Sequence, residues 1–262
     1  MSSNINNHLL YKEVGAIAVL TLNRPQQQNA LSSDLMNELL NKFNSIENNK
    51  KIKVVIIFSN GNNFCAGHDL KELKVDKSEE RFKQLFELCS KLMLKIIKLP
   101  KPVIAGVQGI ATAAGCQLVA SCDLAVASED SKFATPGVNI GLFCSTPMVA
   151  VSRNVNRKQT MEMLLLGEFV DPSKAKEIGL INKVVSNKDL KDETFKMAQI
   201  IASKSPSVVA TGKEAFYKQL EMNTEEAYKY TSQVMSSNML DEDAQEGISA
   251  FIENRSPKWS DR

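Results

Sequence analysis

The sequence is poor in the residues that build metal centres and disulfide frameworks. It contains two histidines, His8 and His68, and its five cysteines are scattered without a CxxC pair or a Cys/His cluster. Zinc sites and disulfide scaffolds depend on such clusters. We therefore expect no metal site and no cofactor, and free thiols of this kind fit a reducing compartment.

Long apolar runs and an excess of one charge are missing as well. No apolar stretch approaches the ~20 residues of a membrane span. Lys+Arg 32 and Asp+Glu 30 nearly cancel, so neither nucleic acid nor a membrane surface is an expected partner. Strand-like sequence begins within about ten residues of Met1, which leaves little room for a leader. A cytoplasmic location is expected, and the mitochondrial matrix is the alternative if the chain is a processed precursor.

What the chain does contain is a repeated alternation of strand and helix patterns. Residues 9–22 predict a β-hairpin, and short apolar runs predict strands at 54–58, 103–107, 124–127 and 132–135. Apolar residues with helical spacing predict helices at 31–46, 79–99 and 114–121. Strand–strand–helix units of this size indicate an α/β fold.

The last sixty or so residues have a different, helical character. Strand signals stop after 180–185. Ser205 followed by Pro206 is a helix-start signal, the segment from Asn223 resembles a capping box, and 240–254 is again compatible with a helix. We expect an α/β core at residues 1–204 and a helical region at 205–262.

Two segments rich in small residues are candidates for ligand binding. The first is FCAGHDLK at 64–71, where a small-residue turn lets backbone approach a ligand closely. The second is GVQGIATAAGCQ at 106–117, where a strand leads into a helix whose first N–H groups have no partner inside the helix. Taken alone, the first segment is more typical of an ordinary turn, and the second fits close helix–strand packing equally well.

Together, in this order, the two segments resemble the enoyl-CoA hydratase/isomerase (crotonase) family. The resemblance runs almost end to end through LNRP at 22–25, NAL at 29–31, KPVIAGVQG at 101–109, FATP at 133–136, LLG at 165–167, AKEIGL at 175–180 and EGISAF at 246–251. Within the family, the sequence is most similar to the enoyl-CoA hydratase domain-containing protein 3 group. Chance agreement over so many ordered blocks is very improbable.

The resemblance implies a spiral of β-β-α units with a C-terminal helical region that forms trimers, often paired into hexamers. It implies an acyl-CoA ligand whose thioester oxygen accepts from the backbone N–H groups of His68 and Ala114. It also implies that CoA is bound by two nearby segments, comprising Gln26, Gln28, Ala66, His68, Asp69, Leu70 and Lys71.

The resemblance breaks at the two glutamates that serve family hydratases as acid and base. Their positions are Gln117 and Gly137 here. Glutamine exchanges no proton in the useful pH range, and glycine has no side chain, so a two-glutamate mechanism is not available. If the scaffold alone limits the chemistry, restoring both carboxylates should raise hydration, and water or a small anion could enter the space expected at Gly137.

Three functions remain open from the sequence. The protein could be an acyl-CoA enzyme with another base or a bound anion, which we favour, a non-catalytic acyl-CoA binder, or an assembly protein. His68 is either a polar side chain at the pocket mouth or an acid/base. Asp69 is expected to brace its loop, and Cys144 is more typical of a packing residue than of a nucleophile.

Overall fold

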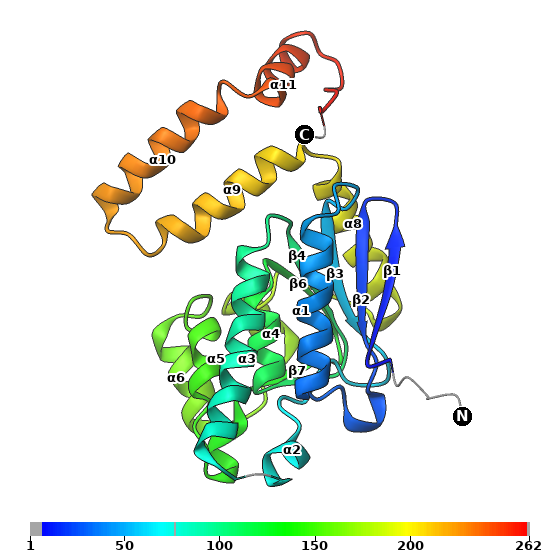
Figure 1. Cartoon of the computed structure of the whole chain (residues 1–262), viewed down its shortest axis with the longest axis vertical. Helices are drawn as coiled ribbons and strands as arrows, with labels where there is room; N and C mark the ends of the chain where they lie inside the picture. Colours follow the sequence, from blue (N-terminus) through cyan, green and yellow to red (C-terminus); the bar gives the residue numbers. More distant parts are fainter. Residues whose placement is uncertain (1–6, 76, 261–262) are drawn as a thin grey trace.

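The computed structural model describes residues 7–75 and 77–260, and a six-stranded sheet forms its centre (Figure 1). The strand order is β1-β2-β3-β4-β6-β8, with β1 antiparallel to β2 and all other neighbours parallel. The strands are β1 (Leu9–Val14), β2 (Ile17–Leu22), β3 (Val54–Ser59), β4 (Val103–Val107), β6 (Leu124–Ser128) and β8 (Lys183–Val185). The predicted hairpin and buried strands are thereby confirmed.

A second, two-stranded sheet lies beside the first and positions the site. It pairs β5 (Ile110–Thr112) with β7 (Lys132–Ala134) in parallel. The units β1-β2-α1, β4-β5-α4 and β6-β7-α5 each follow the strand–strand–helix order. The α/β fold of β-β-α units that the sequence predicts is therefore present, although β5 itself was not predicted, because it lies inside the small-residue segment 106–117 that leads from β4 into the helix.

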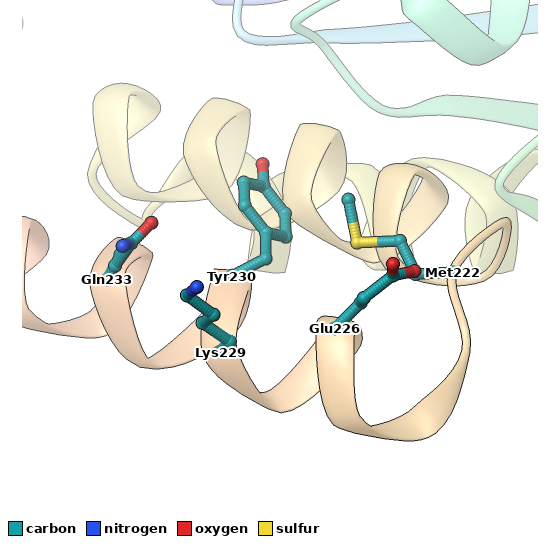
Figure 2. Close-up of a pocket in the computed structure, with 5 residues that line it drawn as sticks. All are labelled: Met222, Glu226, Lys229, Tyr230 and Gln233. Atoms are coloured by element: carbon teal, nitrogen blue, oxygen red, sulfur yellow. The ribbon is translucent and has the colours of Figure 1, made fainter.

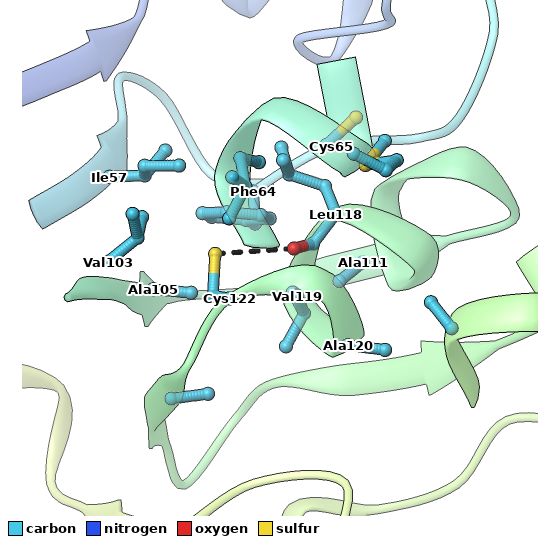
Figure 3. Close-up of a cluster of buried hydrophobic side chains, with 14 of the residues drawn as sticks. Ile57, Phe64, Cys65, Val103, Ala105, Ala111, Leu118, Val119, Ala120 and Cys122 are labelled. Carbon is cyan, nitrogen blue, oxygen red and sulfur yellow. Dashed lines mark hydrogen bonds between the residues drawn. The ribbon is translucent and has the colours of Figure 1, made fainter. Parts of the chain in front are cut away.

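Helices cover both faces of the main sheet, as its wholly apolar central strands require. On one face pack α1 (Ser33–Glu47), α3 (Glu79–Lys98) and α4 (Ala114–Ser121), and on the other packs α8 (Leu190–Ala202) (Figure 1). Figure 3 shows α4 lying against β3 and β4, with Leu118 and Val119 among the core side chains. Ser32 caps α1, because its hydroxyl accepts from the N–H of Leu35.

Several short helices between the predicted elements were not predicted. They are α2 (Leu70–Val75), α5 (Ser145–Val151), α6 (Arg157–Leu166), α7 (Pro172–Glu177) and the 3-10 helices η1 (Pro25–Gln27), η2 (Pro136–Ile140) and η3 (Asn187–Asp189). Most span only one or two turns, which is too short for a helical period to stand out.

The C-terminal helices extend away from the sheet (Figure 1). They are α9 (Pro206–Gln219), α10 (Thr224–Asn238) and α11 (Glu242–Ile252), and α10 buries none of its residues. Lys213 of α9 reaches the core, where its Nζ lies 2.7 Å from Asp123 Oδ2 and also donates to two backbone carbonyls. The division at residue 204 stays a prediction. Within the described residues, no helix has the length and apolarity needed to cross a bilayer.

Candidate active site

The turn at Gly67 and the start of α4 lie against each other. A Cβ built on Gly67 would stand 3.0 Å from the Ala113 Cβ and 3.5 Å from the Ala114 nitrogen. Two backbone hydrogen bonds hold the segments together, from the N–H of Cys65 to Ile110 and from the N–H of Thr112 to Cys65, both 3.0 Å. The fold thus brings together the two small-residue segments that the sequence singled out.

Each predicted N–H donor directly follows a residue with positive φ. Gly67, before His68, has φ +99°, and Ala113, before Ala114, has φ +50° and ψ −118°. Positive φ in alanine costs free energy and is sustained only by surrounding structure. Within residues 7–75 and 77–260, neither the His68 N–H nor the Ala114 N–H donates a hydrogen bond to another group of the chain. Both N–H groups are therefore unpaired within the part of the chain that the structure describes.

A polar hollow lies beside this turn and includes the predicted glutamines. It has a volume of about 320 Å³ and is lined by Pro25, Gln26, Gln28, Gly61, Asn62 and Asn63. The N–H of Ala66 donates to the Gln28 carbonyl at 3.1 Å, so this hollow adjoins the His68 loop. The fully buried Asn29 holds the two sides of the hollow together, since its amide donates to the Asn60 and Asn63 carbonyls. In the sequence, Asn29 stands out only as part of the NAL motif at 29–31.

The carboxylates next to His68 are engaged in structure. Asp69 Oδ2 forms an ion pair of 2.8 Å with Arg24, and Oδ1 accepts from the N–H of Lys71. Burial raises the pKa of Asp69. The hydrogen bonds from Arg24 and from the Lys71 N–H together lower the pKa by more than burial raises it, so the pKa of Asp69 is below its usual value. Glu72 accepts from the backbone and side chain of Ser33. Asp69 thus braces the loop, as expected, while the Leu70 and Lys71 side chains are exposed.

The His68 imidazole lies half-buried against α3. Its ring meets Phe86 edge-on, with 5.4 Å between centroids and 85° between planes. Its Nε2 is buried and has no hydrogen-bond partner among the described residues. Burial lowers the pKa of His68 to about 4, so the imidazole is neutral near pH 7.

Gln117 lies on α4, four residues after Ala113. The Gln117 side chain is buried, and its Oε1 accepts from the Cys89 thiol of α3 at 3.7 Å. Cys89 follows Phe86 by one helical turn, so the two residues share one side of α3. The His68 imidazole and the Gln117 amide therefore meet neighbouring residues of the same helix.

The space expected at Gly137 is filled. A Cβ built there would stand 2.8 Å from the Leu142 carbonyl oxygen, 2.9 Å from Cys144 Sγ and 3.3 Å from the Cys144 nitrogen. Cys144 Sγ also accepts from the N–H of Gly137 at 3.3 Å. The loop from Leu142 to Cys144 therefore occupies the direction that a side chain would take, and the entry of water or a small anion near Gly137 stays a prediction.

The thiols near the site are poor nucleophiles. All five cysteines are free and buried. Burial raises the pKa of Cys116 to about 12, and it also raises the pKa of Cys144, although the Gly137 N–H acts in the opposite direction. A thiol that stays protonated reacts slowly. Among the described residues, no three His, Cys, Asp or Glu side chains converge as metal ligands do.

Comparison with known proteins identifies the family. The sequence model of the enoyl-CoA hydratase/isomerase family matches residues 12–262. The chain belongs to the enoyl-CoA hydratase/isomerase family. It is similar to the mitochondrial enoyl-CoA hydratase domain-containing protein 3 of Xenopus laevis, with 48% identity over 96% of this chain and 85% of the frog protein.

Solved structures of the enoyl-CoA hydratase/isomerase family have the same fold. The crystal structure of the human enoyl-CoA hydratase domain-containing protein 3 is 46% identical, with a TM-score of 0.94, covering 96% of this chain and 100% of the human one. An enoyl-CoA hydratase of Mycobacterium smegmatis is 49% identical, also with a TM-score of 0.94, covering 96% and 98%. The family and fold predicted from the sequence are confirmed.

Proposed function

We propose that this protein binds an acyl-CoA thioester and polarises its carbonyl between the N–H groups of His68 and Ala114. The observation that carries the proposal is the pair of unpaired backbone donors on adjoining segments, each set by a residue of positive φ. Donors held in place before the reaction stabilise a developing oxyanion by ~3–4 kcal/mol each. An enzyme of the hydratase/isomerase type needs such a pair of donors before any acid or base can act on the thioester.

The neighbouring residues fit a CoA thioester. Gln26 and Gln28 line the polar hollow that adjoins the turn, and Ala66 joins that hollow to His68. The exposed Lys71 lies at the start of α2 and offers a charge to a phosphate group. The acyl group would enter on the side of Gln117, and the CoA moiety would lie toward the hollow and the solvent.

The test is removal of one donor. Proline at the first position of a helix lacks an N–H that has no partner in the helix, so Ala114→Pro removes the donor from α4; it also disfavours the φ of +50° and ψ of −118° at Ala113, so the variant is compared only if it folds. We expect the rate of α-proton exchange of butyryl-CoA in D₂O, followed by NMR, to fall about a hundredfold or more. Arg157→Pro, at the first position of α6, is the matched control and should exchange like the wild type. Undiminished exchange in a folded Ala114→Pro protein would refute the donor assignment.

A non-catalytic acyl-CoA binder is the second candidate, and the filled position at Gly137 favours it. Neither Gln117 nor Gly137 supplies a proton, and the nearby Asp69 and Glu72 carboxylates are held by other groups. A binder would show a melting temperature that rises with acyl-CoA but no turnover across a panel of enoyl, hydroxyacyl and acyl thioesters. Turnover of any member assigns an enzyme.

We further propose that the C-terminal helices contact other copies of the chain in a homotrimer or homohexamer. Exposed apolar side chains on α9, α10, α11 and the turn between α10 and α11 support this, since Leu240 in that turn and Phe251 of α11 are each 84% exposed. A shallow pocket of about 240 Å³, lined by Met222 of the turn before α10 and by residues of α10 such as Tyr230, adds to the uncovered surface (Figure 2). A monomer in light scattering at micromolar concentration would contradict the proposal.

We also propose a mitochondrial location for this protein. The frog and human relatives are both named as mitochondrial. Their names support the matrix alternative over the cytoplasmic location that the sequence analysis preferred. Imaging of a fluorescent fusion of the native gene product would distinguish the two.

A further inference from the structure

We propose that Asn60 is a site of spontaneous covalent modification, at which the side chain loses its amide nitrogen as ammonia. The backbone nitrogen of Gly61 attacks the side-chain carbonyl carbon of Asn60, and the new C–N bond closes a succinimide ring. The proton of the Gly61 N–H passes through water to the departing amide nitrogen, which leaves as ammonia. Water then opens the ring, at one carbonyl to give aspartate and at the other to give isoaspartate.

The first observation is that glycine follows the asparagine in an exposed turn. The sequence SNGNN at 59–63 forms the turn after β3, and both Asn60 and Gly61 are exposed. Glycine has no Cβ to hinder the approach of its own nitrogen to a neighbouring group. Asparagine is itself among the thermolabile residue types. Attack on a side-chain amide is therefore sterically easiest at this pair of the turn.

The second observation is that the attacking nitrogen is not engaged. The N–H of Asn60 donates to the Leu22 carbonyl at 2.8 Å, but the N–H of Gly61 donates to no group of the chain within residues 7–75 and 77–260. A nitrogen that already donates a hydrogen bond would have to give up that bond before it attacks. Because both residues are exposed, solvent reaches the nitrogen and the ring that it forms.

The third observation is the hydrogen bond that restrains the reaction. Asn60 Nδ2 donates to Asn23 Oδ1 at 2.9 Å, and Asn23 is itself oriented by donating to the Asn7 carbonyl at 2.9 Å. The Asn60 side chain has to turn toward the Gly61 nitrogen for the attack, which breaks its bond to Asn23. Losing one hydrogen bond of this kind changes an equilibrium by about 2–10-fold. Asn23 thus slows the modification without preventing it.

The modification acts on contacts that hold the polar hollow together. The Asn60 carbonyl accepts from the buried Asn29 amide at 2.8 Å. Gly61 packs against Pro25 so closely that a Cβ built on Gly61 would stand 2.7 Å from the Pro25 Cβ. In isoaspartate the main chain runs through the side-chain carbons, so the backbone between residues 60 and 61 becomes longer and the former Asn60 carbonyl becomes a free carboxylate. The longer backbone must displace Gly61 or Pro25.

The test compares two asparagines of the same tryptic peptide by mass spectrometry. Trypsin releases peptide 54–71, which contains Asn60 and Asn62. The folded wild type is incubated in mildly alkaline buffer, and fragment ions locate the change from amide to acid; a sample digested without incubation corrects for the digestion. We expect Asn60 to convert to a mixture of aspartate and isoaspartate. Asn62 is also exposed but is followed by a residue with a side chain, so it should stay unmodified.

Two variants test the restraint. Asn23→Ala removes the acceptor of the Asn60 amide and should raise the rate of conversion about 2–10-fold. The matched control is Asn37→Ala, which removes an exposed amide of α1 that donates to the Ser33 carbonyl, and it should convert like the wild type. A rate in Asn23→Ala no higher than in the wild type would refute the restraint. If Asn23→Ala does not fold, the comparison of Asn60 with Asn62 in the wild type still decides the inference.

The structural consequence has its own measurement. The isoaspartate form, separated from the unmodified protein by chromatography, should unfold at a lower temperature, and an equal Tm would refute the argument from the packing of Gly61 on Pro25. The inference as a whole would be overturned if Asn60 stays intact in the folded protein while it converts in the free peptide 54–71. Equal conversion of Asn60 and Asn62 in the folded protein would overturn it as well.

Discussion

A methyl group at position 137 should destabilise the protein, because the structure leaves no room for it. The Cβ of Gly137→Ala would stand 2.8 Å from a backbone oxygen of Leu142 and 2.9 Å from Cys144 Sγ. The oxygen cannot rotate away as a side chain does, so the loop must shift. Such overpacking costs about 1–3 kcal/mol, which corresponds to a fall of about 2–12 °C in Tm for a domain of this size.

The assay is thermal unfolding of Gly137→Ala followed by circular dichroism. The control is Gly212→Ala in α9, where nothing lies within 4 Å of the added Cβ. Alanine in a helix interior is more stable than glycine by roughly 0.5–1 kcal/mol, so this variant should match or exceed the wild type. A Gly137→Ala protein as stable as the wild type would refute the steric argument.

The same contacts bear on restoring hydratase chemistry. A glutamate at 137 needs the Cβ that the loop excludes, so Gly137→Glu should displace residues 142–144 rather than present a carboxylate. We therefore expect Gln117→Glu with Gly137→Glu to lower stability without restoring crotonyl-CoA hydration, which revises the expectation drawn from the sequence. Hydration by a double variant of wild-type stability would show that the loop moves freely.

Three further outcomes are expected. Wild-type protein should hydrate crotonyl-CoA at least ~10²–10⁴-fold more slowly than a family hydratase, since neither Gln117 nor Gly137 exchanges a proton; a rate of about 10 s⁻¹ in a spectrophotometric assay would contradict this. Asp123→Asn should cost about 3–5 kcal/mol in urea unfolding, because it leaves the buried Lys213 ammonium without its carboxylate; a cost below about 1 kcal/mol, typical of a surface pair, would show that the pair is unimportant. His68 has its pKa lowered from 6.5 to about 4 in the folded state, so the unfolded state binds more protons between these values and stability falls as pH falls. The difference in unfolding free energy between wild type and His68→Phe should therefore shift by about 3 kcal/mol between pH 7 and pH 4, and a constant difference would show that His68 is not buried as described.

The sequence correctly predicted those helices and strands whose side chains indicate burial along the whole length of the element. The helix at Ala114–Ser121 and the strand at Val103–Val107 were placed to the residue, because the strand has no polar side chain and the helix directly follows a connection of small residues. By contrast, α8 was missed although it covers one face of the sheet. Its buried positions are Leu190, Thr194 and Ala198, so only one of the three is strongly apolar.

The candidate site was predictable as far as it depends on local sequence. The small residues at 66–67 and 113–115 identified the two segments that the structure brings together. Two features depend on contacts from distant parts of the chain and could not be foreseen. The filled position at Gly137 depends on the course of the loop through Leu142, and the unpaired His68 Nε2 depends on how α3 covers the ring.

This chain has the family fold but not the two glutamates of family hydratases. The two can be separated, because the proposed donors belong to the backbone and the acid and base to side chains. The two proposed donors are main-chain groups, and their positions depend on the positive φ angles of Gly67 and Ala113 and on the packing of α4. None of these depends on whether residue 117 is glutamate or glutamine. On the proposed function, a chain without the acid/base side chains would lose proton transfer and would still polarise the carbonyl. In the proposed function, the ligand itself, or water, must then carry the proton.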